Sequence, residues 1–308
     1  MSETLNFVPR SAPRRRGDDD AALQRRLASW NRQRLAIQTP TANWRDLLEA
    51  DLDMRMAEGA FLERTRLAQA ERAAEAPRNP TAFVAWFEAL ERCGPGQRDP
   101  LFPWLARAAT LTEMRWFLEQ EVAGEAGFDD LVALAQIKAP VQAKLELARN
   151  YWDEMGRGNP KGMHGPMLDF MAKALNLKPE IETTLAPALA LGNTMIGLAT
   201  NRRYVYHAIG ALGVIELTAP GRATLVAEGL KRLGIPARER HYFDLHAVLD
   251  VKHSEAWNRE VLHPLVSDNP SCAQYLAEGA LMRLQCGAAC FDAYRAHLWS
   301  GAGTAPPA

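Results

Sequence analysis

Apolar residues recur at helical spacing along most of this 308-residue chain, and almost no segment alternates in the manner of a β-strand. Pro, Gly or Asn residues interrupt the periodic segments at the joins. The predicted helices span residues 20–38, 43–75, 80–93, 101–137 with interruptions, 140–155, 162–175, 179–198, 201–217, 221–233, 236–262 and 269–298. Asn43 is the predicted N-cap of the second helix. The sequence therefore predicts an all-α protein.

The predicted helices divide into an N-terminal extension and a bundle. Residues 1–19 are predicted to be a disordered arm, because a run of three arginines is followed by three aspartates. Residues 20–78 form the helical extension, residues 79–300 the bundle, and residues 301–308 a disordered tail. The extension either packs across the bundle or contacts a partner subunit, and the sequence does not choose between these arrangements.

Composition excludes several classes of partner. The formal net charge is −1, so no global field attracts nucleic acid or an anionic membrane. The chain has no run of about 18 apolar residues and no apolar signal segment at its N-terminus. None of the four cysteines lies in a CxxC pair. We therefore expect a cytoplasmic protein without nucleic-acid or membrane partners, and we favour a homodimer.

The segment HYFDLHAVLDVKH carries a polar stripe. His246, Asp250 and His253 are spaced by four and three residues, which places them within roughly 60° of one another on a helix. Apolar neighbours such as Leu245 and Val248 predict that this helix faces the interior. Buried His and Asp side chains are costly without partners. The stripe therefore predicts further polar groups on facing helices, which is how helical bundles hold iron or manganese.

Glu216 is the clearest candidate for such a partner. It follows the apolar stretch AIGALGVI, where an unpaired carboxylate would be desolvated. The alternative is an exposed acid near a helix end, just before Pro220. A second candidate is the pair Glu154 and His164, which flank the break GRGNPKG and can turn inward from two consecutive helices. The alternative here is ordinary helix-end chemistry. The adjacent Asp153 is expected to point elsewhere.

Glu121 and Glu125 lie one turn apart in the segment WFLEQEVAGEAGF, and each is also explained as a solvated acid. Taken together, the candidate acids and histidines form a set of six or seven donors on four or five helices. Two iron ions need that many N and O donors if positions are to stay open for O2.

These residues resemble a known family, the haem-oxygenase-like diiron oxidases, also described as iron-containing redox enzymes. The resemblance covers about residues 121–264 and depends on DEMGRGNPKGMH, AIGALGVIE and FDLHAVLDVKH. It implies a single haem-oxygenase-like bundle of about seven core helices that binds no haem. It also implies a ligand set for two metal ions: Glu125, Glu154, His164, Glu216, His246, Asp250 and His253. Glu121 is the alternative to Glu125 and otherwise a group just outside the ligands.

The resemblance implies two Fe ions as cofactors, with Mn in one site as an alternative, and O2 as co-substrate. It implies O2 activation through a peroxo-diiron intermediate by an oxygenase or oxidase. The expected substrate is a small amine, amino acid or fatty-acid-like molecule, which undergoes N-oxygenation or oxidative C–C cleavage. Two other functions stay open: a ferritin-like iron-binding protein or ferroxidase, and a helical scaffold with a buried polar network.

The sequence leaves the substrate-binding residues open. Arg149, Arg202 and Arg203 are candidates for holding a substrate carboxylate, although each also fits a surface arginine near a helix end. His207 lies nine residues before Glu216, which turns it roughly away from that residue on a helix, so we expect it to have a structural role or to lie just outside the ligands.

Overall fold

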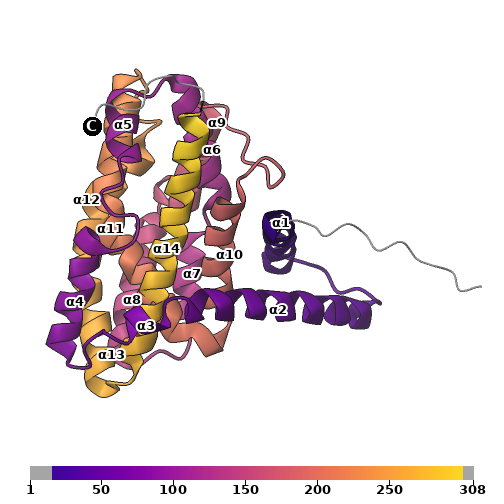
Figure 1. Ribbon diagram of the computed structural model, residues 1–308, viewed down its shortest axis with the longest axis vertical. Helices are drawn as coiled ribbons and strands as arrows, with labels where there is room; N and C mark the ends of the chain where they lie inside the picture. Colours follow the sequence, from indigo (N-terminus) through magenta and orange to yellow (C-terminus); the bar gives the residue numbers. More distant parts are fainter. Residues whose placement is uncertain (1–15, 301–308) are drawn as a thin grey trace, which may run out of the picture.

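A computed structural model describes residues 16–300, and these residues form helices joined by short loops (Figure 1). The elements are α1 (Arg16–Leu35), α2 (Trp44–Leu67), α3 (Ala70–Ala73), α4 (Pro80–Cys93), α5 (Leu101–Arg107), α6 (Leu111–Gly124), α7 (Phe128–Ala135), α8 (Val141–Glu154), η1 (Gly156–Gly158), η2 (Pro160–Gly162), α9 (His164–Ala174), α10 (Ala186–Thr200), η3 (Arg202–Tyr204), α11 (Val205–Arg232), α12 (His241–Trp257), the π-helical turn η4 (Asn258–Leu262), α13 (His263–Asp268) and α14 (Cys272–Leu298). Within this range the one β interaction is an isolated bridge between Met155 and Met163. The prediction of an all-α protein is confirmed.

Several predicted boundaries differ from the structure. Helix α1 begins at Arg16, four residues before the expected start, while residues 1–15 and the predicted tail at 301–308 lie outside the described residues. The prediction of a helix from residue 179 was wrong, because residues 179–185 form a loop with a turn at 181–183, and α10 begins only at Ala186. Asn43 precedes α2 as predicted, but its side chain makes no capping hydrogen bond.

The predicted break before Pro220 was also wrong. Helix α11 continues from Val205 through Pro220 to Arg232. Proline has no amide proton, so the carbonyl four residues earlier, that of Glu216, loses its usual helical donor. Buried residues on both sides of the proline, among them Val214 and Val226, anchor the helix in the core. Tertiary packing therefore overrides the local signal for a helix end.

Helices α11 and α14 form the centre of the bundle, and glycines bring their backbones together. A Cβ atom added to Gly210 would lie 1.9 Å from the carbonyl oxygen of Leu276, and one added to Gly279 would lie 1.9 Å from that of His207. Within the described residues, the segment Arg202–Arg232 has the length and composition to cross a membrane, and 56% of its most apolar window is buried inside the bundle. In the structure this segment is a core helix.

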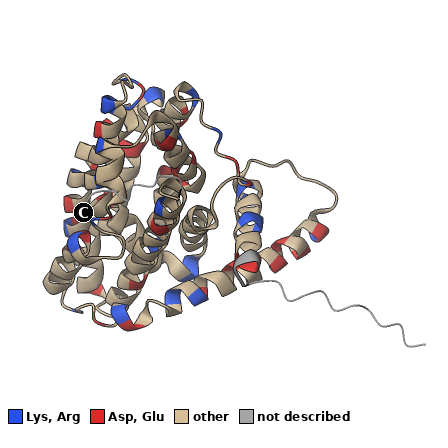
Figure 2. Ribbon diagram, turned by 45° about the horizontal axis from the view of Figure 1, so that its top comes forward, with Lys and Arg blue, Asp and Glu red and all other residues tan. Residues whose placement is uncertain are grey.

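The N-terminal extension packs across the bundle. Figure 1 shows α2 extending sideways from the base of the bundle, with α1 beside α10. A buried ion pair joins Arg34 on α1 to Glu58 on α2 at 2.6 Å, and Arg34 also donates to the Thr200 hydroxyl on α10. Asn31 donates to Asn193 across the same contact. Figure 2 shows acidic and basic residues interspersed along the outer helices. The extension is therefore fixed to α10 by buried polar contacts within one chain.

Candidate metal centre

A tight corner between α8 and α9 brings Glu154 and His164 together. Gly156 and Gly158 have φ angles of +60° and +85°, the left-handed region that glycine adopts without strain. A Cβ atom on Gly156 would also lie 2.5 Å from the carbonyl carbon of Gly162. The bridge between Met155 and Met163 closes the corner. As a result Glu154 Oε2 lies 3.0 Å from His164 Nδ1, although ten residues separate them.

Helix α12 turns its polar stripe inward. His246, Asp250 and His253 are 7%, 4% and 6% exposed. The expectation that Val248 faces the interior was wrong, because this side chain is 64% exposed and Val251 is 46% exposed. A helix that buries its charged face and exposes apolar residues requires a compensating partner for that face. The polar side chains that face this stripe come from α8, α9 and α11.

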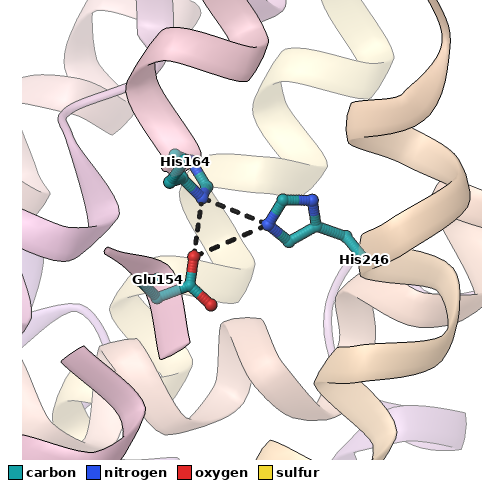
Figure 3. Close-up of side chains that lie close together, drawn as sticks. All are labelled: Glu154, His164 and His246. Carbon is teal, nitrogen blue, oxygen red and sulfur yellow. Dashed lines mark hydrogen bonds and ion pairs between the residues drawn. The ribbon is translucent and has the colours of Figure 1, made fainter. Parts of the chain in front are cut away.

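Glu154 belongs to two groups of candidate ligands, one on each carboxylate oxygen. Glu154 Oε2 lies 3.0 Å from His164 Nδ1 and 3.6 Å from His246 Nε2 (Figure 3). Glu154 Oε1 lies 3.5 Å from His253 Nδ1, which in turn lies 3.4 Å from Glu216 Oε1. Within each group the three donor atoms lie within 4.8 Å of one another. Glu154 is therefore the residue that the two groups share, with one oxygen facing each.

Three carboxylates, those of Glu154, Glu216 and Asp250, are buried close together in the cluster. Burial, followed by the nearby carboxylates of Glu216 and Glu154, raises the pKa of Asp250 well above its ordinary value. Asp250 Oδ1 and His253 Nδ1 are both buried without a hydrogen-bond partner among the described residues. Buried polar atoms left in this state are uncommon unless a water or an ion satisfies them. The donor set, three carboxylates and three imidazoles, fits a transition metal such as iron.

In the metal-free protein, protons on histidine provide part of the missing positive charge. Burial alone would lower the pKa of His164, but the carboxylates of Glu125 and Glu154 outweigh it and raise the pKa to about 10. Burial likewise opposes protonation of His253, and Glu216 is the main group that raises its pKa to about 9. Metal ions bind neutral imidazole, so binding would displace these protons.

Hydrogen bonds outside the cluster orient its donor atoms. The Nδ1–H of His246 donates to the backbone carbonyl of Tyr242 at 2.6 Å, which leaves Nε2 free to act as a ligand. Asn150 donates to Glu216 Oε1 at 2.5 Å, and the Tyr242 hydroxyl lies 3.1 Å from His164 Nε2. Asp153 lies outside both groups of candidate ligands, and its Oδ2 lies 3.3 Å from His253 Nε2, the nitrogen opposite the cluster; the sequence did not predict this contact. The sequence did not predict the contacts of Asn150 or Tyr242.

The two first-helix glutamates occupy different positions. Glu125 accepts backbone N–H groups of Gly127 and Phe128 at 2.7 and 3.1 Å, and its Oε1 lies 3.5 Å from His164 Nε2, the nitrogen opposite the cluster. Glu121 lies farther along the same cavity, where burial raises its pKa and Arg283 partly offsets that effect. Neither glutamate belongs to the two groups that share Glu154. The ligand assignment for this helix stays a prediction.

A cavity of about 180 Å³ opens onto the cluster. Glu154, Glu216, His246 and Asp250 line one part of it. Aromatic and aliphatic side chains line the rest, including Phe102, Phe117, Val226, Phe291 and Tyr294. His207 is not part of this site: it pairs with Glu278 at 2.9 Å, as expected for a structural histidine. The cavity provides an apolar space next to the candidate ligands.

The fold and the site define a class, a helical bundle with buried carboxylate and histidine donors beside a small cavity. The sequence model of a family described as iron-containing redox enzyme matches residues 115–288, more than half of the chain. The chain belongs to this iron-containing redox enzyme family, and its fold is haem-oxygenase-like. The family resemblance predicted from the sequence is confirmed.

The comparison with solved structures supports the fold. A CADD-like protein of unknown function from Nostoc punctiforme PCC 73102, solved at 2.00 Å resolution, is similar with a TM-score of 0.50 and 16% sequence identity, covering 79% of this chain and 98% of that chain. Its structure at 1.35 Å gives a TM-score of 0.48 with 17% identity, covering 81% and 100%. No curated protein matches this chain. At this identity the likeness bears on the fold alone.

Proposed function

We propose that this protein is a non-haem diiron oxidase or oxygenase that uses O2 to oxidise a small organic substrate. The observation that carries the proposal is the position of Glu154, whose two oxygens face two separate groups of donors. One cation would be held by Glu154, His164 and His246, and the other by Glu154, Glu216 and His253. The unpartnered Oδ1 of Asp250 would provide a further oxygen ligand next to these groups.

The residues around the cluster have separate tasks in this proposal. Two iron ions, when bound, would supply the electrons that reduce O2. Asp153 and the Tyr242 carbonyl hold His253 and His246 so that the opposite nitrogen of each ring faces the cluster. The apolar wall formed by residues such as Phe117 and Val226 excludes bulk water from the reacting centre. A buried, largely apolar cavity favours an organic substrate over a ferroxidase that handles iron alone.

The reaction that we propose is N-oxygenation of an amine or amino acid, or oxidative C–C cleavage of an amino acid or fatty-acid-like molecule. Each needs O2, two electrons or more, and a substrate held next to the metal ions. The cavity of about 180 Å³ is smaller than the roughly 300–1,000 Å³ of pockets that enclose drug-sized ligands. It therefore suits a small substrate.

Anaerobic titration of the metal-free protein with Fe(II) tests the proposal. The wild type should bind two Fe(II) per chain, and Glu216→Ala should retain one tightly bound ion. Glu154→Ala should weaken both ions, because its carboxylate belongs to both groups. Glu255→Gln is the matched control, an exposed acid on α12 outside the cluster. Equal losses of Fe(II) binding in Glu216→Ala and Glu154→Ala would contradict the shared role of Glu154. A wild-type protein that binds no Fe(II) would favour a helical scaffold over an enzyme.

Rapid mixing of the Fe(II)-loaded protein with O2 then separates an oxygenase from a ferroxidase. An oxygenase or oxidase should convert a member of an amine, amino-acid and fatty-acid panel in proportion to the O2 consumed. A ferroxidase should consume O2 as iron is added and leave every organic compound unchanged. Metal analysis of the protein as purified would show whether manganese occupies one of the positions.

A further inference from the structure

Three charged side chains line the cavity away from the cluster and have no ion-pair partner among residues 16–300. They are Glu121 on α6, Arg222 on α11 and Arg283 on α14. Arg222 donates to the Thr218 hydroxyl at 3.1 Å and approaches Gln97 Oε1 at 3.5 Å, both neutral groups. The arginines proposed from the sequence lie elsewhere: Arg149 and Arg203 have side chains that are 66% and 73% exposed.

The charges at this end of the cavity do not cancel. Two guanidinium groups face one carboxylate, that of Glu121, whose pKa is raised by burial. Burial and the nearby Arg283 lower the pKa of Arg222 only to about 9. Arg222 therefore remains charged at neutral pH. An uncompensated charge in a confined site is costly, and an anionic ligand would remove that cost. The buried Tyr294 side chain lines the same part of the cavity, beside Glu121.

Neighbouring residues hold the two guanidinium groups in place. The Arg222 guanidinium lies 5.7 Å from the ring centroid of Phe291 and 5.9 Å from that of Phe102. Gly287, one turn after Arg283 on α14, leaves room for the Arg283 guanidinium, since a Cβ atom there would lie 2.9 Å from Nη1. Phe102, Phe291 and Gly287 thus shape the part of the cavity that contains the two guanidinium groups.

This end of the cavity lies within reach of the cluster. On α6, Glu121 precedes Glu125 by four residues, a rise of about 6 Å along a helix. On α11, Arg222 follows Glu216 by six residues, a rise of about 9 Å. Both helices carry a cluster-side acid and a charged residue one to two turns away. A small molecule can therefore contact the arginines and the cluster at the same time.

We propose that Arg222 and Arg283 bind the carboxylate of an organic-acid substrate. The carbon chain of this substrate extends toward the cluster along the phenylalanine side chains that line the cavity, Phe102, Phe117 and Phe291. The role of this molecule as substrate rests on the proposed function, whereas its binding does not. The guanidinium groups outnumber the one carboxylate at this end of the cavity, which favours an anion, and the apolar lining formed by residues such as Phe102 and Phe291 favours a carbon chain over inorganic phosphate. Guanidinium groups bind carboxylates through paired charge-assisted hydrogen bonds.

Binding of hexanoate, hexan-1-ol, hexylamine and inorganic phosphate, measured by calorimetry, tests this proposal. Measurements on both the metal-free protein and the anaerobic Fe(II)-loaded protein separate the arginine site from direct binding at the cluster. Hexanoate should bind at least ten-fold more tightly than hexan-1-ol in both forms, and phosphate and hexylamine should bind more weakly than hexanoate. Equal binding of hexanoate and hexan-1-ol, or tighter binding of phosphate, would overturn the proposal.

Substitution of each arginine tests whether the carboxylate binds at Arg222 and Arg283. Arg222→Gln and Arg283→Gln should each weaken the binding of hexanoate at least ten-fold and leave the binding of hexan-1-ol unchanged. Lys231→Gln, an exposed cation on the same helix as Arg222, should change neither. Should either glutamine variant fail to fold, Arg283→Lys keeps the charge but loses the paired donors, and it should weaken hexanoate by a smaller factor. Wild-type hexanoate affinity in every folded variant would overturn the proposal. Because binding is read without turnover, this result is independent of whether the protein proves to be a diiron oxygenase.

Discussion

Asp153 and Glu154 are adjacent on α8, yet they contact opposite nitrogens of one imidazole. Asp153 Oδ2 lies 3.3 Å from His253 Nε2, and Glu154 Oε1 lies 3.5 Å from His253 Nδ1. The carboxylate on the outer side fixes the orientation of the ring, and the one on the inner side shares the candidate metal position with it. The end of α8 thus provides both a ligand and the residue that orients another ligand.

Asp153→Asn should weaken metal binding while leaving the fold intact. Loss of the carboxylate removes a charge-assisted partner of His253, and such losses outside the ligands typically cost about 10–100-fold in metal affinity. Anaerobic Fe(II) titration should show weaker binding of one of the two ions. Asp169→Asn, an exposed acid on α9 paired with Lys173, is the control and should bind both ions normally. An unchanged titration for Asp153→Asn would show that this contact does not support the site.

The contact between α11 and α14 should tolerate no side chain at Gly210. An added Cβ would lie 1.9 Å from the Leu276 carbonyl oxygen, so Gly210→Ala must separate the two central helices. We expect a loss of about 3 kcal/mol or more in the free energy of unfolding, at the upper end of overpacking effects. The control is Gly221→Ala on the same helix, where nothing lies within 4 Å. It should stabilise the protein by roughly 0.5–1 kcal/mol, because alanine favours the helix. Urea unfolding of both variants checks the difference in sign.

The N-terminal extension should contribute to stability through Arg34 and Glu58. Their side chains are 11% and 6% exposed, and they join α1 to α2 beside α10. Glu58→Ala leaves the Arg34 guanidinium buried without its partner, which should cost about 3 kcal/mol. Arg55→Ala removes an exposed pair on the same helix and should cost less than about 1 kcal/mol. Similar unfolding curves for the two variants would mean that the extension does not depend on the buried pair.

The metal-free protein should lose stability as the pH rises above neutral. The folded-state pKa values of His164 and His253 are raised from 6.5 to about 10 and about 9, so the folded state binds these protons more tightly than the unfolded state. Their contribution is complete below about pH 6.5 and is lost as the pH rises through about 9 to 10. Urea unfolding at a series of pH values should show this fall. The slope should be smaller in His164→Asn and unchanged in His241→Asn, which alters an exposed residue at the start of α12.

The sequence predicted the parts of the site that depend on local spacing. His246, Asp250 and His253 share one face because helical geometry requires it, and the glycines after Glu154 indicated the corner that brings in His164. Contacts made between elements were not predictable in this way. The contact of Asp153 with the outer nitrogen of His253 depends on how α8 packs against α12, which local spacing does not show. Arg222 and Arg283 carry no local signal and meet only where α11 and α14 pack together.

The uninterrupted course of α11 through Pro220 has a consequence for motion at the cluster. The carbonyl of Glu216 lacks its helical N–H partner, so the backbone that carries this carboxylate is held by one constraint fewer than its neighbours on the same helix. Glu216, a candidate ligand, therefore lies where the helix loses one backbone hydrogen bond, between buried segments on either side. Pro220 thus makes the backbone at Glu216 less constrained than the rest of α11.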